Sequence, residues 1–215
     1  MTHKRVIAAI LFTLAVPVLI SVWVVRGVIR SQGDDQTLRE KAKKQGVFRE
    51  LQQPKSTTVY ADLADLVNNS AAVIIGTVQK NTPVLSTDGK SLSLDYAITV
   101  EYVYKGRIKR GTTIIVSLPG GRMKFEDGSI AEIMTPWFKK MQNGKTYALF
   151  LQPEGGSSRF ITTGEAQGVI EIPTTPEDRT VKTHSGLPNQ TIRKYNGQDV
   201  KVFFRELRQV TGKPL

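Results

Sequence analysis

Positions 6–25 are predominantly apolar and carry no charge, and they form the longest such run in the chain. At a helical rise of about 1.5 Å per residue the run spans roughly 30 Å, the thickness of the hydrocarbon core of a bilayer. Lys4 and Arg5 precede it, and the sequence VVRGVIR after it does not resemble a signal-peptide cleavage site. The pattern predicts an uncleaved signal anchor, with one transmembrane helix within residues 1–30.

Two rules disagree about the side of the membrane on which the rest of the chain lies. More Lys and Arg follow the apolar run than precede it, which by the positive-inside rule favours a cytoplasmic C-terminal domain. A short basic tail before a first apolar segment is, however, the usual start of an export signal. We favour export, and we expect a single-pass protein of the cytoplasmic membrane with an extracytoplasmic C-terminal domain.

Residues 31–58 change to a polar pattern in which charges of both signs alternate. Such alternation is typical of a solvated helix, which Gly46 interrupts. The sequence QQPKSTT then has the composition of a linker. We expect a charged stalk and linker here, and contact of its basic residues with the membrane surface is the alternative.

Beyond residue 58 the apolar residues follow the two-residue period of β-strands. In SLSLDYAITVEYVYKG they share one parity, which predicts a long strand with one face in the core. These side chains are Leu92, Leu94, Tyr96, Ile98, Val100, Tyr102 and Tyr104. At about 3.3 Å per residue the strand extends over about 40 Å, so we expect it to bend strongly, as strands of small barrels do.

Shorter apolar runs flank this strand and predict further strands in AAVIIGTVQ, TTIIVSL, TYALFLQ, RFITTG and AQGVIEIP. Asp127-Gly128 predicts a hairpin turn, and YADLADLVNNSA predicts a short helix. The fold class is therefore mainly β, a small antiparallel barrel of about 5–7 strands over residues 59–173. Residues 174–196 are polar and contain prolines, so we expect a flexible loop. The apolar residues of 197–215 fall at helical spacing, which predicts a C-terminal amphipathic helix.

The order of these elements carries a resemblance. The chain has S-x-x-V-x-x-G-x-V in SAAVIIGTV, then VEYVYKG, a strand that runs into PGG, G-x-x-Y-x-L-F-L in GKTYALFL and a final QG-x-x-x-I. Residues 60–172 thereby resemble a widespread, uncharacterised bacterial membrane-anchored domain with an OB-like barrel. They are more distantly similar to the netrin-module and tissue-inhibitor-of-metalloproteinase barrels. The resemblance implies an OB-like fold. Metalloproteinase inhibition does not carry over, because those inhibitors place an N-terminal cysteine on the target's metal and this chain has no cysteine.

The composition excludes several kinds of chemistry. Without cysteine the chain can form no disulfide, no thiolate zinc site and no cysteine nucleophile. His3 and His184 are the two histidines of the sequence, too few for a histidine-rich metal site, and a histidine-based triad is hard to build. We therefore expect neither a metal nor a cofactor.

Carboxylate catalysis would need two acids at a defined separation, and no spacing in this sequence forces two acids together. The candidates are Glu101, Glu126, Asp127, Glu132, Glu165 and Glu171. Ser70 and Ser117 lack the G-x-S-x-G context of a nucleophilic serine. We expect no enzyme activity, and a cryptic hydrolase is the remaining alternative.

The sequence SLPGGR at residues 117–122 raises the question of a phosphate-binding loop. A P-loop requires G-x-x-x-x-G-K-[ST] between a strand and a helix. Here Pro119 has no N–H to donate, and Arg122 stands in place of the Lys–hydroxyl pair. Pro-Gly after an apolar run is the usual punctuation at the end of a strand. We interpret the sequence as a turn in which Gly120 or Gly121 permits the reversal.

The formal net charge of +11 favours anionic partners. OB-folds bind single-stranded nucleic acid with a basic groove and stacking aromatic side chains. The aromatic candidates are Tyr96, Tyr102, Tyr104, Phe125 and Trp137. The tyrosines share a parity with Leu and Ile, so core packing is the better interpretation, and export would make nucleic acid unlikely as a ligand. A single-stranded nucleic-acid-binding protein that faces the cytoplasm is the alternative.

Our interpretation is a membrane-anchored extracytoplasmic binding or scaffold module without catalytic activity. Residues 6–25 hold it in the membrane, and its partner is an envelope protein, a peptide or an anionic polymer. The predicted binding surface is a barrel rim formed by the turns 105–111 and 118–122 and the segment 134–144. Its predicted residues are Lys105, Arg107, Lys109, Arg110, Gly120, Gly121, Arg122 and Trp137.

Overall fold

The computed structural model describes residues 36–53, 58–156, 158–175, 177–184 and 194–213. The predicted signal anchor lies outside these residues. Within the described ranges, none of the helices combines the length and the apolar character that crossing a membrane requires.

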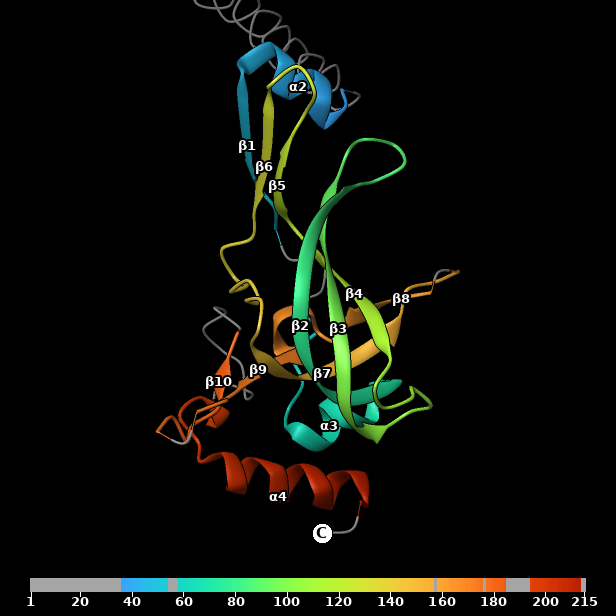
Figure 1. The fold of residues 1–215 in the computed structure, drawn as a ribbon, viewed down its shortest axis with the longest axis vertical. Helices are drawn as coiled ribbons and strands as arrows, with labels where there is room; N and C mark the ends of the chain where they lie inside the picture. Colours follow the sequence, from blue (N-terminus) through green and yellow to red (C-terminus); the bar gives the residue numbers. More distant parts are fainter. Residues whose placement is uncertain (1–35, 54–57, 157, 176, 185–193, 214–215) are drawn as a thin grey trace, which may run out of the picture.

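Seven strands form the larger of two sheets, in the spatial order β10-β9-β7-β2-β3-β4-β8 (Figure 1). The strand β8 pairs with two neighbours, β4 in parallel and β7 antiparallel, whereas the other pairings of this sheet are antiparallel. The strands are β2 (Ala72–Leu85), β3 (Leu92–Lys105), β4 (Thr113–Pro119), β7 (Thr146–Pro153), β8 (Arg159–Thr162), β9 (Val169–Ile172) and β10 (Lys182–Thr183). The mainly β fold class is confirmed.

A smaller sheet of three strands in the order β1-β6-β5 lies beside the distal end of the long β2–β3 hairpin (Figure 1). Its strands are β1 (Val47–Leu51), β5 (Gly121–Lys124) and β6 (Ile130–Met134). The predicted hairpin at Asp127-Gly128 joins β5 to β6 and is confirmed. Helix α2 (Leu38–Gln45) packs on this sheet and receives the hairpin tip, where the Leu38 amide donates to the Gly89 carbonyl at 2.8 Å.

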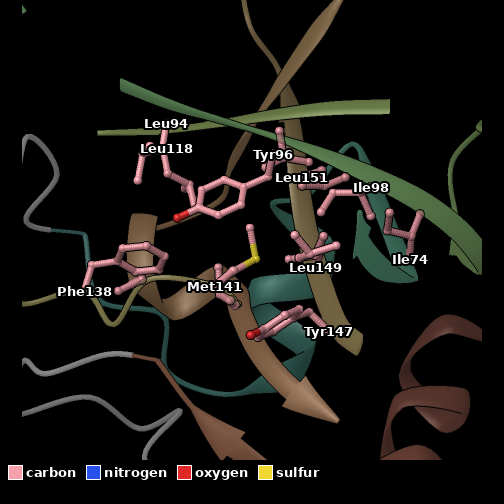
Figure 2. Close-up of a cluster of buried hydrophobic side chains, with 14 of the residues drawn as sticks. Ile74, Leu94, Tyr96, Ile98, Leu118, Phe138, Met141, Tyr147, Leu149 and Leu151 are labelled. Atoms are coloured by element: carbon pink, nitrogen blue, oxygen red, sulfur yellow. The ribbon is translucent and has the colours of Figure 1, made fainter. Parts of the chain in front are cut away.

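Three groups of buried side chains hold the elements together. The first lies on the concave side of the larger sheet, where Tyr96, Tyr147 and Phe138 pack with aliphatic residues of β2, β3, β4 and β7 (Figure 2). The second lies between β7, β9 and two helices, α3 (Leu63–Asn68) and α4 (Val200–Thr211). The third lies between α2 and the smaller sheet. The larger sheet is therefore covered on both faces.

Both helices predicted in the folded domain are confirmed, and their ends follow from local chemistry. In α3 the side chain of Asp62 accepts from the Asp65 amide at 2.8 Å, and the helix stops at Asn69. In α4 the side chain of Asp199 accepts from the Lys201 amide at 2.8 Å, and Gly212 closes the helix in a left-handed conformation. The apolar stripe of α4 buries Phe203 and Leu207. A 3-10 helix, η1 (Glu165–Gly168), links β8 to β9.

The predicted long strand is observed as β3, and its expected buried parity is interrupted at one position. This parity is buried from Leu92 to Val100 and again at Tyr104, which lies in the second core, whereas Tyr102 is 42% exposed. Beyond that point Val103 packs against the first core. The pairing of β2 with β3 shifts register three times, and one of these shifts, between Ile75 and Gly76, lies beside this part of β3. Such irregularities twist and bend a strand pair, and the face that β3 turns to the core changes along its length.

Two segments differ from their expected structure. The polar segment 31–58 contains α2 as expected, but Gly46 ends the helix and β1 follows, since Val47 and Phe48 pair with β6. In the segment 174–196, the described residues are not uniformly a flexible loop. Val181, His184 and Tyr195 are buried, because they pack against the larger sheet and α4.

Candidate functional site

The residues of the predicted rim do not form one surface. The turn that holds Arg107, Lys109 and Arg110 follows the end of β3, where Lys105 pairs with Val73. Residues 118–122 lie beside the start of the same strand, because Leu118 pairs with Leu94 and the Gly120 amide donates to the Leu92 carbonyl at 2.9 Å. The whole length of β3, over about 40 Å, therefore separates the two turns.

Two residues of the predicted rim have structural roles. The ammonium of Lys105 donates to the carbonyls of Val67 and Asn68 at 2.8 and 3.2 Å, which satisfies the open carboxyl end of α3. Trp137 is buried in the first core, and its indole N–H donates to the carboxylate of Glu165 at 3.1 Å. Neither residue offers a free surface to a ligand in the way that the sequence analysis predicted.

The PGG sequence at residues 119–121 connects β4 of the larger sheet to β5 of the smaller sheet. Pro119 is the last residue of β4, and Gly121 is the first of β5. Gly120 and Gly121 have φ angles of 93° and 133°, and a Cβ at Gly120 would lie 2.8 Å from the Cγ2 of Thr135. The glycines therefore allow a tight bend between two strands, where we had predicted a chain reversal.

A cleft of about 720 Å³ lies where the larger sheet meets the hairpin tip and the β7–β8 turn. Its floor comes from β3 and β4, with Ser93, Ser117 and Leu118. Residues 84–87 of the hairpin form one wall, and the β7–β8 turn with β8 forms another. Most of these positions come from elements far apart in sequence, so the cleft is a product of the fold.

The chemistry of the lining is hydroxyl-rich and carries few basic groups. The hydroxyl side chains are Ser86, Thr87, Ser91, Ser93, Ser117, Thr162 and Thr163. Glu154 and Glu165 add carboxylates, and the single basic side chain among the lining residues that the structure describes is that of Arg159. In a chain of net charge +11, this cleft is therefore locally acidic.

Arg159 is held in place by Asp95. Its guanidinium lies 3.2 Å from the Asp95 Oδ2, and the Asp95 side chain is 11% exposed. The other oxygen of this carboxylate, Oδ1, is buried without a hydrogen-bond partner. Asp95 neighbours Ser117 across the β3–β4 pairing, so the ion pair lies at the cleft floor. The contact with Oδ2 therefore orients the Arg159 guanidinium at the cleft.

Glu165 is the one non-glycine residue with a positive φ, 54°, among those that the structure describes. Gly164 before it has a φ of 65°, and a Cβ there would lie 2.6 Å from the ring of Tyr60. Gln167 secures Tyr60, because its Oε1 accepts from the Tyr60 amide at 3.1 Å and its Nε2 donates to the Thr58 carbonyl at 2.8 Å. The strained backbone places Glu165 at the border of the cleft, where its carboxylate accepts from the Trp137 indole N–H, and strain of this kind is common at functional sites.

A second polar cluster lies outside the cleft, and its Glu171 and His184 side chains are buried. The Glu171 carboxylate contacts the Lys145 ammonium at 3.0 Å and the His184 Nε2 at 3.3 Å, and the His184 Nδ1 bonds the Lys139 carbonyl. Burial lowers the pKa of His184, against the effect of its bonds to Lys139 and Glu171. For Glu171 burial raises the pKa, but the bonds from Lys145 and His184 outweigh it and hold the pKa below the usual value. The cluster ties the chain after β9 to β7.

The aromatic candidates for base stacking are mostly in the cores. Tyr96, Tyr104, Phe125 and Trp137 are buried, and Tyr102 is the exposed one. The acids offer no metal site either, because no group of three or more His, Asp or Glu side chains gathers within the described ranges.

The residues of the cleft carry no sequence motif, so the cleft was not predicted from the sequence. The Ser91, Ser93 and Asp95 parity of β3 was visible as the polar face of the long strand, and this alternation was the available signal. The positions of Tyr60, Glu154 and Glu165 against that face depend on the tertiary fold. No protein-family model matches this chain, and no curated protein sequence matches it significantly.

Proposed function

We propose that the protein is a non-enzymatic binding module with an OB-like barrel, held at the outer side of the cytoplasmic membrane by residues 6–25. The strand pairings support the barrel, because β7-β2-β3-β4-β8 is a continuous series of neighbours and β8 pairs back to β7. The parallel contact of β4 with β8 supports the OB-like order, in which the third and fifth strands meet.

The observation that carries the proposal is the position of the cleft. OB-folds bind their ligands on the face of the second and third strands, between the loop that joins strands one and two and the loop that joins strands four and five. In this chain those elements correspond to β3 and β4, the β2–β3 hairpin and the β7–β8 turn. All of them line the cleft, together with the strained Glu165.

The cleft chemistry favours a neutral or basic ligand over nucleic acid. Single-stranded nucleic acid requires a basic groove with aromatic platforms. The cleft has two glutamates, one arginine that is paired with Asp95, and Tyr60 as its aromatic side chain. Of the partners that the sequence analysis left open, an envelope protein or peptide fits these residues better than an anionic polymer does.

The basic turn at residues 105–111 supports the alternative function, which is binding of single-stranded nucleic acid. Arg107, Lys109 and Arg110 are exposed, and Tyr102 near the same end of β3 is exposed as well. A cytoplasmic protein could use this end for electrostatic contact with nucleic acid. The two functions therefore place their ligands at opposite ends of β3, which makes them separable by experiment.

Site-specific photo-crosslinking in cells that produce the full chain tests the proposal. p-Benzoylphenylalanine replaces Ile161 in the cleft or, as a matched exposed position, Arg107 in the basic turn. We expect an adduct from position 161 that mass spectrometry identifies as an envelope component, and none from position 107. Protease treatment of intact spheroplasts should digest the barrel. A protected barrel together with nucleic acid cross-linked at position 107 would establish the alternative instead.

A further inference from the structure

The smaller sheet turns one face to α2 and leaves the other open. On its three strands, the residues of the third core under α2 are Phe48, Met123, Ala131 and Ile133. Because side chains alternate along a strand, the neighbours of these residues lie on the opposite side of the sheet. The strand pairing arranges those neighbours in three rows, which together we call the open face. The first row is Val47, Ile130 and Lys124, the second is Arg49, Glu132 and Arg122, and the third is Leu51 and Met134.

The open face is positively charged. It carries three cations, Arg49, Arg122 and Lys124, and one carboxylate, that of Glu132. Arg49 bonds this carboxylate at 2.9 Å and is the main cause of its lowered pKa, to which the charge of Arg122 adds. In the part of the chain that the structure describes, no ion pair joins Arg122 or Lys124 to an acid. The residues of this face therefore have an excess of two positive charges.

The same face exposes apolar side chains. Leu51 is 58% exposed, Val47 is 40% exposed and Met134 is 37% exposed. Among the described residues, three of the six exposed large apolar side chains thus lie on one face of a three-stranded sheet. Apolar side chains that gather on an exposed face with a polar border mark a surface that contacts a protein or a membrane.

The length of chain before α2 keeps this sheet close to a bilayer. The proposed anchor ends at Val25, and α2 begins at Leu38, 13 residues later. Even fully extended, these residues span at most about 45 Å. β1 follows α2 after Gly46, so the first strand of the smaller sheet comes directly after this tether. A tether of this length presents the membrane to the open face at a high effective concentration.

Charge selects the membrane over a second copy of the chain as the partner. Two open faces laid against each other would bring cations against cations, which disfavours association. An anionic phospholipid surface attracts Lys and Arg side chains within a Debye length, and apolar side chains beside them can enter the headgroup region. Helix α2 offers cations without such apolar side chains, because its Leu38 and Ala42 are buried.

We propose that the open face of the smaller sheet docks onto the anionic phospholipid surface of the membrane that holds the anchor. Arg122 and Lys124 contact headgroup phosphates, while Leu51 and Met134 enter the headgroup region. The inference rests on the membrane anchoring of the proposed function and specifies which surface of the folded chain meets the lipid. It explains why exposed apolar side chains and cations without acidic partners share one face.

A fluorescent label on the open face tests the docking. The chain has no cysteine, so Leu51→Cys attaches a single nitrobenzoxadiazole label to the full chain. We compare nanodiscs of phosphatidylcholine alone with nanodiscs of equal parts phosphatidylcholine and phosphatidylglycerol. We expect blue-shifted emission, and quenching by lipids with a nitroxide headgroup, in the anionic discs alone. Tyr102→Cys is the matched control, because Tyr102 is exposed near the α3 end of β3, and Figure 1 shows α3 and the smaller sheet at opposite ends. Its label should give the same emission in both discs.

Charge variants assign the docking to the open face. Arg122→Gln combined with Lys124→Gln removes two cations and should lower the ratio of docked to undocked chain at least about tenfold. Fluorescence lifetimes of the label at position 51 give this ratio. Arg107→Gln combined with Lys109→Gln removes the same charge from the basic turn and should leave the ratio unchanged. Equal thermal midpoints of both double variants and the parent chain exclude misfolding as the cause.

Two results would contradict the inference: emission at position 51 that does not depend on phosphatidylglycerol, or a change in emission that requires two copies of the chain in one disc. The second result would assign the open face to another copy. Failure of the proposed function is distinguishable. A chain that does not enter nanodiscs would remove the anchor, and flotation with phosphatidylglycerol vesicles would then test the face alone. Flotation that the Arg122 and Lys124 substitutions abolish would keep the docking, and absence of flotation would remove both.

Discussion

The two sheets of this protein differ in how many of their faces are covered. The larger sheet has one core on its concave side and a second core under α3 and α4, so the first six positions of β7 are all buried. The smaller sheet has α2 on one face, and four of the five residues of β1 are exposed. Its open face carries Leu51 and Met134, which are 58% and 37% exposed and lie side by side in register.

Because their faces are covered differently, the two sheets should differ in how easily they open locally. Elements that are buried on both faces open with free energies close to that of global unfolding, whereas elements with few buried contacts open locally. The cleft lies where residues of both regions meet, with Gln52 from the chain after β1 and Ser117 from β4. We therefore expect the larger sheet to supply the rigid floor of the cleft and the smaller sheet to be the more easily opened part.

The largest expected effects compare the same substitution in the two regions. Phe150→Ala removes a fully buried ring from the second core, and we expect it to lower the free energy of unfolding by about 3–5 kcal/mol. Phe125→Ala removes a ring from the third core, where Arg39 covers it at 5.2 Å from the ring centroid. Its effect on global unfolding should be smaller, because the third core has the fewest buried side chains of the three and belongs to the sheet that we expect to open locally.

Urea denaturation measures the global change, and amide hydrogen exchange resolves its location. Phe125→Ala should accelerate exchange in β5 and β6 while β2, β3 and β7 stay protected. If both variants shift the protection of both sheets equally, the two regions unfold as one unit and the comparison fails.

We expect a smaller loss of stability from a substitution at Gly120, in the connection between the two sheets. Gly120→Ala combines a φ of 93° with a Cβ 2.8 Å from the Thr135 Cγ2 and 3.0 Å from the Ile133 carbonyl oxygen. We expect a loss of about 1–3 kcal/mol, measured by denaturant unfolding. Gly128→Ala is the control, because its φ is 86° but its Cβ would have no neighbour within 4 Å. Equal losses would show that backbone conformation alone, and not the close approach of the sheets, makes Gly120 necessary.

The pH dependence of the free energy of unfolding should reflect His184, which packs against the larger sheet. Burial lowers the pKa of His184 in the folded state below the value of about 6.5 in the unfolded chain. Between these two pKa values the unfolded chain binds more protons, so stability is fully present above pH 6.5 and falls as the pH decreases through the folded pKa. One such group changes the free energy by at most about 1.4 kcal/mol per pH unit.

Thermal midpoints between pH 7.5 and 5.5 measure this dependence. Glu171 stays ionised in that window, because the bonds from Lys145 and His184 outweigh burial and hold its pKa below the usual value. His184→Gln should flatten the profile of the parent chain. A midpoint that rises on acidification would mean that the Glu171 and Lys139 bonds, and not burial, govern His184.

Periodicity predicted most strands and both helices of the folded domain, because those elements bury continuous or alternating apolar positions. β7 and α4 are examples in which the pattern of one segment determines the buried side. The parity of β3 predicted the core from Leu92 to Val100 and was wrong at Tyr102. Register shifts of β2 cause the difference, and they depend on pairing between strands, which one strand's pattern does not contain.

β1 and the cleft escaped prediction for related reasons. VFREL has two adjacent charged residues and no two-residue apolar period. Its pairing with β6 joins segments 83 residues apart, as Arg49 and Glu132 show. The predicted rim combined the turns 105–111 and 118–122, but β4 runs antiparallel to β3 between them and so carries them to opposite ends of β3. Trp137 and Lys105 then proved to satisfy Glu165 and the end of α3.

The smallest expected effect lies on the open face of the smaller sheet. Arg49 and Glu132 form an ion pair at 2.9 Å with side chains that are 60% and 24% exposed. The Arg49 bond is also the first cause of the lowered pKa of Glu132. Exposed pairs contribute about 0.2–1 kcal/mol and are screened by salt. Arg49→Ala should therefore shift the unfolding midpoint slightly at low salt and less at 0.5 M NaCl. A large, salt-independent loss would mean that another element covers this face, and the contrast between the two sheets would then disappear.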